Sequence, residues 1–255
     1  MSAEMLKVSG LQMRFGGLLA VDGIEFDVRR DEVFAIIGPN GAGKTTVFNC
    51  VGGFYKPTAG EIMLDGHSIA RLPSHQVARR GLVRTFQNIR LFKQLTVVEN
   101  LMVAQHLQVK AGLLHGLLAT PAYRHAERAA LGRAAEWLER MGLTSVANRE
   151  AGTLSYGHQR RLEIARCMIT KPRLLMLDEP AAGLNPQEKI ELQQLIDKLR
   201  REFNISVLLI EHDMSLVMGV SDRILVMEHG KPIMVGKPEE VRNDPRVIKA
   251  YLGED

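Results

Sequence analysis

The residue types best suited to holding phosphate lie together, in the run Gly38-Pro39-Asn40-Gly41-Ala42-Gly43-Lys44-Thr45-Thr46. The run matches G-x-x-x-x-G-K-[ST] and follows the apolar segment Val33–Ile37, as a phosphate-binding loop follows its strand. Glycines let successive backbone N–H groups turn toward an anion, and the start of the following helix favours negative charge. Lys44 could reach the β and γ phosphates of a nucleoside triphosphate, and the Thr45 hydroxyl could complete a Mg²⁺ shell. Taken alone, the run could also be a glycine-rich turn without a ligand.

Two further segments have residue types that could complete such a site. Asp178-Glu179 ends the apolar run Leu174–Leu177, and ligands of open parallel sheets lie beyond the carboxyl ends of the strands. Asp178 could hold Mg²⁺ directly or through water, and Glu179 could orient or deprotonate an attacking water; alone, the pair could be a solvated turn. Ser155, within Leu154–Gln159, is a good N-cap, and a capped helix start that contains glycine is also an anion site.

The hydrophobic pattern predicts the elements that must position these residues. Apolar and polar residues alternate in 11–15 and 24–28, which predicts β structure at the start of the chain. The segments 174–177 and 206–210 are apolar throughout, with a helix predicted at Gln187–Phe203 between them, which favours a parallel sheet covered on both faces. A hairpin is expected at 223–236. The side chains expected to face inward from the helix are Ile190, Leu195, Ile196, Leu199 and Phe203.

Helix formers dominate from about Thr96 to Arg149, where Pro121 predicts a division into at least two helices. We interpret a stripe at helical spacing there as core packing rather than a ligand site. The prediction is a single domain over 1–255, with an α/β core at 1–87 and 165–255 and an inserted helical lobe at about 88–164. The stripe consists of Ala130, Ala134, Trp137, Leu138 and Met141.

Composition limits the classes of function. The 255 residues are 45% hydrophobic and 24% charged, and a net charge of +4 is no signature of nucleic-acid binding. Two cysteines, Cys50 and Cys167, favour reduced thiols over a disulfide framework or a zinc site. The N-terminus lacks the apolar core of a signal peptide, and polar residues interrupt the longest apolar stretch, Leu101–Leu118. We therefore expect a protein in the cytosol, even if it works at a membrane.

Five motifs occur in a fixed order: the phosphate loop, the lone Gln87, L-S-x-G-x-Q at Leu154–Gln159, Asp178-Glu179, and Glu211-His212-Asp213. In this order they resemble the ATP-binding subunit of an ABC transporter, over essentially the whole chain. The resemblance implies a P-loop NTPase (RecA-like) core with a parallel sheet, an N-terminal antiparallel β portion and an inserted helical lobe. It implies ATP and Mg²⁺ as ligands.

The resemblance also implies a role for each matching residue. Phe15 would stack on adenine, although it could instead be a strand-core residue. Ser155 and Gly157 would bind the γ-phosphate held by the other subunit. The catalytic set would be Lys44, Gln87, Glu179 and His212, with Gln87 sensing the membrane partner and His212 holding the γ-phosphate and positioning Glu179; a strand-end histidine can also be incidental. The metal set would be Thr45, Gln87 and Asp178.

Departures from the general ABC pattern narrow the resemblance. Tyr156 stands where glycine is usual, His158 where glutamine is usual, and Asn185 where many relatives have aspartate. Tyr-Gly, the run A-A-G-L-N-P and the segment Phe15–Val21 resemble the branched-chain amino-acid uptake ATPases of the LivG-like type. The lipopolysaccharide-export ATPase shares the Tyr-Gly and A-G-L-N-P features and is the alternative for cargo.

The resemblance implies a dimer with a second ATP-binding subunit, identical or related, arranged head to tail around two ATP molecules. Two membrane permeases and, indirectly, a periplasmic solute-binding protein would be the other partners, without nucleic acid. The location implied is peripheral, on the cytoplasmic side of the bacterial inner membrane. One alternative is a soluble ABC-type ATPase acting on nucleic acid or ribosomes. Another is a regulatory ATP-binding module without turnover.

Overall fold

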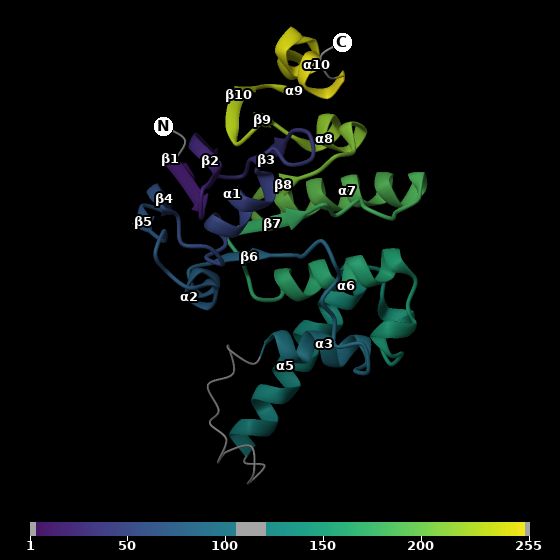
Figure 1. The fold of residues 1–255 in the computed structure, drawn as a ribbon. Helices are drawn as coiled ribbons and strands as arrows, with labels where there is room; N and C mark the ends of the chain where they lie inside the picture. Colours follow the sequence, from purple (N-terminus) through teal and green to yellow (C-terminus); the bar gives the residue numbers. More distant parts are fainter. Residues whose placement is uncertain (1–3, 106–120, 253–255) are drawn as a thin grey trace. The chain divides into compact units, whose positions relative to one another are not determined.

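The computed structural model describes residues 4–105 and 121–252. The chain divides into two compact units, one formed by 1–84 with 173–255 and the other by 85–172 (Figure 1). The helical segment expected at about 88–164 falls inside the second unit. Most of the apolar stretch Leu101–Leu118 lies outside the described residues.

The first unit begins with an antiparallel sheet, as the alternating pattern predicted. Its strands have the order β2-β1-β4-β5. The turn between β4 and β5 places Asp65 and Gly66 at positive φ, at 48° and 73°, so the Asp-Gly pair closes the hairpin. The strands are β1 (Glu4–Phe15), β2 (Leu18–Arg29), β4 (Ala59–Leu64) and β5 (His67–Ser68).

A six-stranded sheet with the order β10-β9-β3-β8-β7-β6 forms the centre of the first unit. β9, β3, β8, β7 and β6 are parallel, and β10 pairs with β9 in the antiparallel sense. Every residue of β3, β7 and β8 is buried, which confirms the predicted parallel sheet covered on both faces. The strands are β3 (Val33–Ile37), β6 (Leu82–Arg84), β7 (Leu174–Asp178), β8 (Ser206–Ile210), β9 (Arg223–Glu228) and β10 (Lys231–Gly236).

Helices cover this sheet, and the longest of them in the described part of the unit corrects one prediction. Leu192, Ile196 and Leu199 of α7 are buried, but Ile190 is 49% exposed, so the expectation that it faces inward is wrong. At about 100° per residue, Ile190 lies about 120° around the helix from Ile196 and is therefore off the buried stripe. The helices are α1 (Lys44–Val51), α2 (Ser74–Arg79), α7 (Pro186–Phe203), α8 (Met214–Val220), α9 (Pro238–Asn243) and α10 (Pro245–Leu252).

One hydrophobic cluster joins the two sheets through α1. Phe34 of β3 and Phe48 of α1 belong to it together with residues of β1, β2 and β4. Cys50 lies in the same cluster, and Cys167 is buried in the second unit; both are free thiols. Burial raises the pKa of each thiol to about 12, so both stay protonated and unreactive at neutral pH.

The second unit is helical in its described part. α3 and α5 are separate helices, and α5 begins at Pro121, so the predicted division is confirmed. The five residues of the predicted stripe are all buried. Gln105 donates to the carbonyl of Ala130 at 2.9 Å and so links the end of α3 to α5. The helices are α3 (Val97–Ala104), α5 (Pro121–Arg140), the 3₁₀ turns η2 (Thr144–Val146) and η3 (Ala151–Thr153), and α6 (Tyr156–Met168). Within the described residues, we find no helix with the length and apolar character that a membrane span requires.

Candidate functional site

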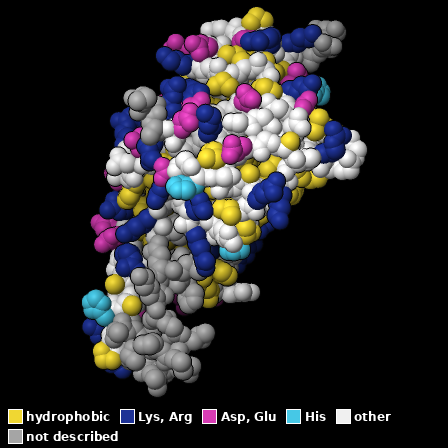
Figure 2. All heavy atoms as spheres, turned by 90° about the vertical axis from the view of Figure 1, so that its left-hand side faces the viewer, with side chains coloured by type: hydrophobic (Ala, Val, Ile, Leu, Met, Phe, Trp, Pro, Cys, Tyr) yellow, Lys and Arg dark blue, Asp and Glu magenta, His cyan; other side chains and the backbone are white. Residues whose placement is uncertain are grey.

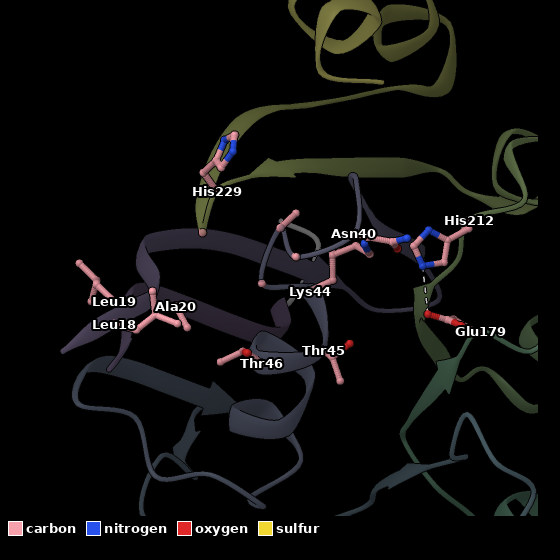
Figure 3. Close-up of a pocket in the computed structure, with 14 residues that line it drawn as sticks. Leu18, Leu19, Ala20, Asn40, Lys44, Thr45, Thr46, Glu179, His212 and His229 are labelled. Carbon is pink, nitrogen blue, oxygen red and sulfur yellow. Dashed lines mark hydrogen bonds and ion pairs between the residues drawn. The ribbon is translucent and has the colours of Figure 1, made fainter. Parts of the chain in front are cut away.

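The phosphate-loop sequence forms a turn between a buried strand and a helix, as its pattern predicted. β3 ends at Ile37 and α1 begins at Lys44. Gly41 and Gly43 have φ values of 81° and 94°, a region that residues with a Cβ rarely adopt, and they turn the loop toward the start of α1. A cavity of about 430 Å³ opens there (Figure 3). It is lined by the predicted residues Asn40, Gly41, Ala42, Gly43, Lys44, Thr45, Thr46, Glu179 and His212.

Lys44 lies inside the loop rather than in solvent. Its Nζ donates to the carbonyl oxygens of Gly38 at 2.7 Å and Pro39 at 2.9 Å, and the residue is only 5% exposed. Burial lowers the pKa of Lys44, and the negative charge of Glu179 acts in the opposite direction. These two carbonyls accept from two of the three N–H groups of the ammonium and, being neutral, do not balance its charge. An anion in the cavity would do so.

Glu179 and His212 meet at the ends of neighbouring parallel strands. Glu179 follows the end of β7, His212 comes two residues after β8, and His212 Nε2 lies 3.0 Å from Glu179 Oε1 (Figure 3). Glu179 has a positive φ of 46°, so the chain turns sharply as the strand ends. The pair has the geometry of a carboxylate base oriented by a hydrogen-bond partner.

Asp178, predicted as a metal ligand, is buried beside Arg84. Arg84 Nη2 donates to Asp178 Oδ2 at 2.7 Å, and Arg84 Nη1 donates to Asn49 Oδ1 at 2.8 Å. The sequence did not predict a role for Arg84, because only the pairing of β6 with β7 brings this residue next to Asp178.

The donor set fits Mg²⁺ that arrives with a polyphosphate. Among the described residues, no group of three or more His, Cys, Asp or Glu side chains could hold a metal alone. Mg²⁺ is commonly bound through one or two protein oxygens, waters and substrate phosphates, and the Thr45 hydroxyl and the Asp178 carboxylate are oxygens of that kind.

One edge of the cavity comes from residues that the sequence did not single out for the site. They are Leu18, Leu19 and Ala20 of β2, with His229 and Gly230 at the turn from β9 to β10. Gly230 N–H donates to the carbonyl of Ala42 at 3.1 Å, and Asp22 N–H donates to the carbonyl of Gly230 at 2.8 Å. The sequence predicted a hairpin at 223–236 but carried no signal that the tip of this hairpin contacts the phosphate loop.

Phe15, predicted to stack on adenine, lies at the end of β1 and is 42% exposed. Its ring and the Tyr55 ring form a T-shaped pair, with centroids 5.3 Å apart. It is not among the residues that line the cavity, and its exposure excludes the alternative of a buried strand-core residue.

The remaining predicted residues, Gln87, Ser155 and Gly157, belong to the second unit. Ser155 is the N-cap of α6 and is exposed; its Oγ accepts from the N–H of His158 at 3.4 Å. Gly157 lies in the first turn of the same helix.

A buried ion pair of α6 holds the backbone around Gln87. Arg160 Nη1 donates to Glu163 Oε2 at 2.7 Å and to the carbonyl of Phe86 at 3.0 Å, and Arg160 Nη2 donates to the carbonyl of Gln87 at 3.2 Å. Burial raises the pKa of Glu163, whereas the charge of Arg160 lowers it. Tyr156, the departure from glycine in the motif, accepts a hydrogen bond from Arg160 at 3.2 Å through its hydroxyl. The backbone around Gln87 is therefore anchored to the helix that begins at Ser155.

Comparison with known proteins places these features in a family. The family model described as ABC transporter matches residues 21–182, and the model described as Branched-chain amino acid ATP-binding cassette transporter matches residues 231–255. The chain is 63% identical to the high-affinity branched-chain amino acid transport ATP-binding protein BraF of Pseudomonas aeruginosa, and 61% identical to LivG of Escherichia coli strain K12. Each match covers 100% of both chains. Identity to the lipopolysaccharide export system ATP-binding protein LptB of Haemophilus influenzae is lower, at 34% over 98% of both chains.

Solved structures of ATP-binding cassettes agree with this family assignment. The ADP conformation of MJ1267, an ATP-binding cassette of an ABC transporter, matches with a TM-score of 0.85 and 31% identity, covering 98% of this chain and 99% of that one. A dimeric post-hydrolysis state of the ATP-binding cassette MJ0796, bound to ADP and Pi, matches with a TM-score of 0.77 and 25% identity, covering 92% of this chain and 99% of that one. The chain therefore belongs to the ABC transporter family, as an ATP-binding subunit of the branched-chain amino-acid type.

Proposed function

We propose that this chain binds ATP with Mg²⁺ in the cavity of its first unit and hydrolyses it to drive uptake of branched-chain amino acids. One observation carries the proposal: the phosphate loop, Glu179 and His212 line a single cavity of about 430 Å³. A cavity of this size suits a small-molecule ligand. The cargo is supported by the 63% identity to BraF and by the match of residues 231–255 to the branched-chain amino-acid model.

Each side chain has a role in this proposal. Lys44 binds the β and γ phosphates, and the N-terminus of α1 favours their negative charge. Glu179 orients and deprotonates the attacking water, while His212 holds the γ-phosphate and keeps Glu179 in place; the 3.0 Å contact between them supports this pairing. Phe15, exposed at the end of β1, stacks on adenine.

The metal would be held by Thr45 and Asp178, with Gln87 contributing directly or through water. Bound Mg²⁺ supplies charge neutralisation to the phosphate oxygens. Arg84 fixes the orientation of the Asp178 carboxylate through the 2.7 Å hydrogen bond.

The assembly proposed is a head-to-tail dimer with an identical or related ATP-binding subunit, in which Ser155 and Gly157 bind the γ-phosphate held by the other subunit. The exposed N-cap of α6 supports an anion-binding role, because the dipole of a helix favours negative charge at its N-terminus. The dimeric structure of MJ0796 with ADP and Pi supports the assembly. Two permeases, served by a periplasmic solute-binding protein, would complete the importer at the cytoplasmic face of the bacterial inner membrane.

A nucleic-acid partner has less support. In the upper part of the face drawn in Figure 2, Lys and Arg side chains are interspersed with Asp and Glu side chains. The mixed signs agree with a net charge of only +4. A binding track for a polyanion usually gathers basic residues in one stripe.

Leucine uptake in the native host tests the proposal. Deleting the gene should abolish high-affinity uptake of radiolabelled leucine, and the wild-type chain should restore it. Glu179→Gln should fail to restore uptake, whereas the control Glu239→Gln, an exposed carboxylate in the first turn of α9, should succeed. Uptake that survives the deletion would contradict the cargo. Restoration by Glu179→Gln would contradict the role of that carboxylate.

A further inference from the structure

Glu211 is a buried carboxylate that has no role in the proposal above. It is 3% exposed and lies between Ile210, the last residue of β8, and His212. Its Oε1 accepts from the backbone N–H of Ala181 at 2.6 Å. Its Oε2 accepts from the backbone N–H groups of His212 at 2.8 Å and Asp213 at 3.1 Å. One side chain thus receives three backbone hydrogen bonds from two separate segments of the chain.

The sheet explains why the carboxylate can reach both segments. β7 and β8 are parallel neighbours, with Asp178 opposite Ile210, so the segments that follow the two strands leave the sheet at the same edge. Glu179 N–H donates to the carbonyl of Ile210 at 2.9 Å, which extends the pairing by one step. The positive φ of Glu179 then turns its chain away, and beyond this point the Glu211 side chain takes over as the link between the two segments.

The two anchored segments are the ones that carry Glu179 and His212. Ala181 lies two residues after Glu179, and the N–H of His212 is itself one of the three donors. Charge-assisted hydrogen bonds of this kind are stronger and more directional than neutral ones. A displacement of about 1 Å at a reacting group can cost about a hundredfold in rate.

We propose that Glu211 is a positioning residue, whose carboxylate fixes the backbone on both sides of the Glu179–His212 pair and so sets its 3.0 Å contact. The inference rests on the proposed roles of Glu179 and His212 in ATP hydrolysis. Both oxygens must accept, because all three partners are N–H groups. A glutamine at this position would turn an NH₂ group toward one of these segments.

An ion pair between Lys189 and Asp213 lies next to the segment that follows Glu211. Lys189 Nζ on α7 lies 2.5 Å from Asp213 Oδ2, and Asp213 caps α8 by accepting from the N–H of Leu216 at 3.0 Å. This pair fastens the start of α8 to α7 but touches neither Ala181 nor Glu179 through any contact described above. Glu211, by contrast, contacts the segment after Glu179 directly, through the N–H of Ala181.

The test compares Glu211→Gln with a matched control, Glu32→Gln. Glu32 is also a buried carboxylate, 5% exposed, and accepts from the backbone N–H of Arg29 at 2.6 Å, but it lies at the amino end of β3, away from the phosphate loop. Glu211→Gln should lower kcat for ATP hydrolysis at least tenfold and change the Kd for ATP, measured by calorimetry, less than about twofold. Glu32→Gln should leave kcat within about twofold of wild type at a temperature where both variants are folded.

Measurement of the Glu211→Gln effect in a Glu179→Gln background separates positioning from a general structural role. If Glu211 acts through Glu179, the second change should alter the residual single-turnover rate less than about twofold; an equal loss in both backgrounds would overturn the inference. Where Glu211→Gln does not fold, Glu211→Asp serves instead, because it keeps the charge and withdraws the oxygens by one methylene. Unchanged kcat in the folded variant would also overturn it. If Glu179→Gln alone leaves turnover normal, the proposed function fails instead.

Discussion

Lys44 is only 5% exposed, and its ammonium group donates hydrogen bonds to the neutral carbonyls of Gly38 and Pro39. A buried full charge whose hydrogen bonds go to neutral acceptors has lost hydration that those acceptors, and the nearby charge of Glu179, replace only in part. Phosphate oxygens in the cavity would provide the opposite charge. We therefore expect Lys44 to bind a triphosphate more strongly than a solvated lysine would.

Gly38 lies where the phosphate loop approaches β9 closely, so a substitution there tests how tightly the loop packs against the sheet. Its φ is 149°, and a Cβ there would lie 2.1 Å from the carbonyl oxygen of Met227 on β9. Gly38→Ala should lower the free energy of unfolding by about 2 kcal/mol or more in urea denaturation, because the loop or the strand must move. Gly41, at φ 81°, has nothing within 4 Å of such a Cβ, so Gly41→Ala should cost only about 1 kcal/mol of backbone strain.

The control for both is Gly17→Ala, a glycine without a positive φ and with open space around it, which should change stability by less than about 0.5 kcal/mol. Equal losses at Gly38 and Gly17 would show that the close approach to β9 does not exist in solution.

Among the elements, β2 and β9 belong to different sheets and are joined by one bidentate pair. Arg223 Nη1 and Nη2 donate to the two carboxylate oxygens of Asp27 at 3.0 Å each, and Arg223 Nη1 also reaches Glu32 Oε1 at 3.3 Å. The hydrogen bonds from Arg223 to Asp27, helped by the charges of Arg223 and Arg29, lower the pKa of Asp27, while partial burial opposes the shift. The ion pair therefore couples the two sheets through a titratable group.

The sign of the resulting pH dependence follows from the lowered pKa. Because the folded pKa of Asp27 lies below its ordinary value of 3.8, its contribution to stability is complete above pH 3.8 and is lost as the pH falls through the folded pKa. Arg223→Leu should lower the free energy of unfolding by about 1 to 2 kcal/mol at pH 7, measured in urea. The difference from wild type should hold down to about pH 5 and shrink below pH 3.8. A difference that does not change with pH would contradict this account.

The sequence predicted elements better than it predicted their contacts. The strands at 174–177 and 206–210 could be predicted because runs that are apolar throughout are typical of strands buried on both faces of a parallel sheet. The prediction for Ile190 is wrong because it grouped this residue with the buried stripe of α7, although the angle between residues of a helix places Ile190 on another side.

The contact of Gly230 with Ala42 could not be predicted, because it joins a hairpin tip to a loop almost 190 residues earlier and has no periodic pattern. The sequence indicated Glu211 only as part of the motif Glu211-His212-Asp213, because its three N–H partners become apparent only in the fold.

On the scale of the whole molecule, the predicted site residues divide between the two units. The phosphate loop, Asp178, Glu179 and His212 belong to the first unit, while Gln87, Ser155 and Gly157 belong to the second. The order of the five motifs along the chain predicted the family, which the comparisons confirm. The roles of Ser155 and Gly157 stay a prediction, because they require a second subunit that one chain does not contain.

Nucleotide shared between two subunits is the central claim of the account. The most direct measurement is the structure of Glu179→Gln, which should bind ATP without hydrolysing it, determined with ATP and Mg²⁺. The account predicts a dimer in which each ATP contacts Lys44 of one chain and Ser155 of the other. ATP contacted by residues of a single polypeptide would contradict it.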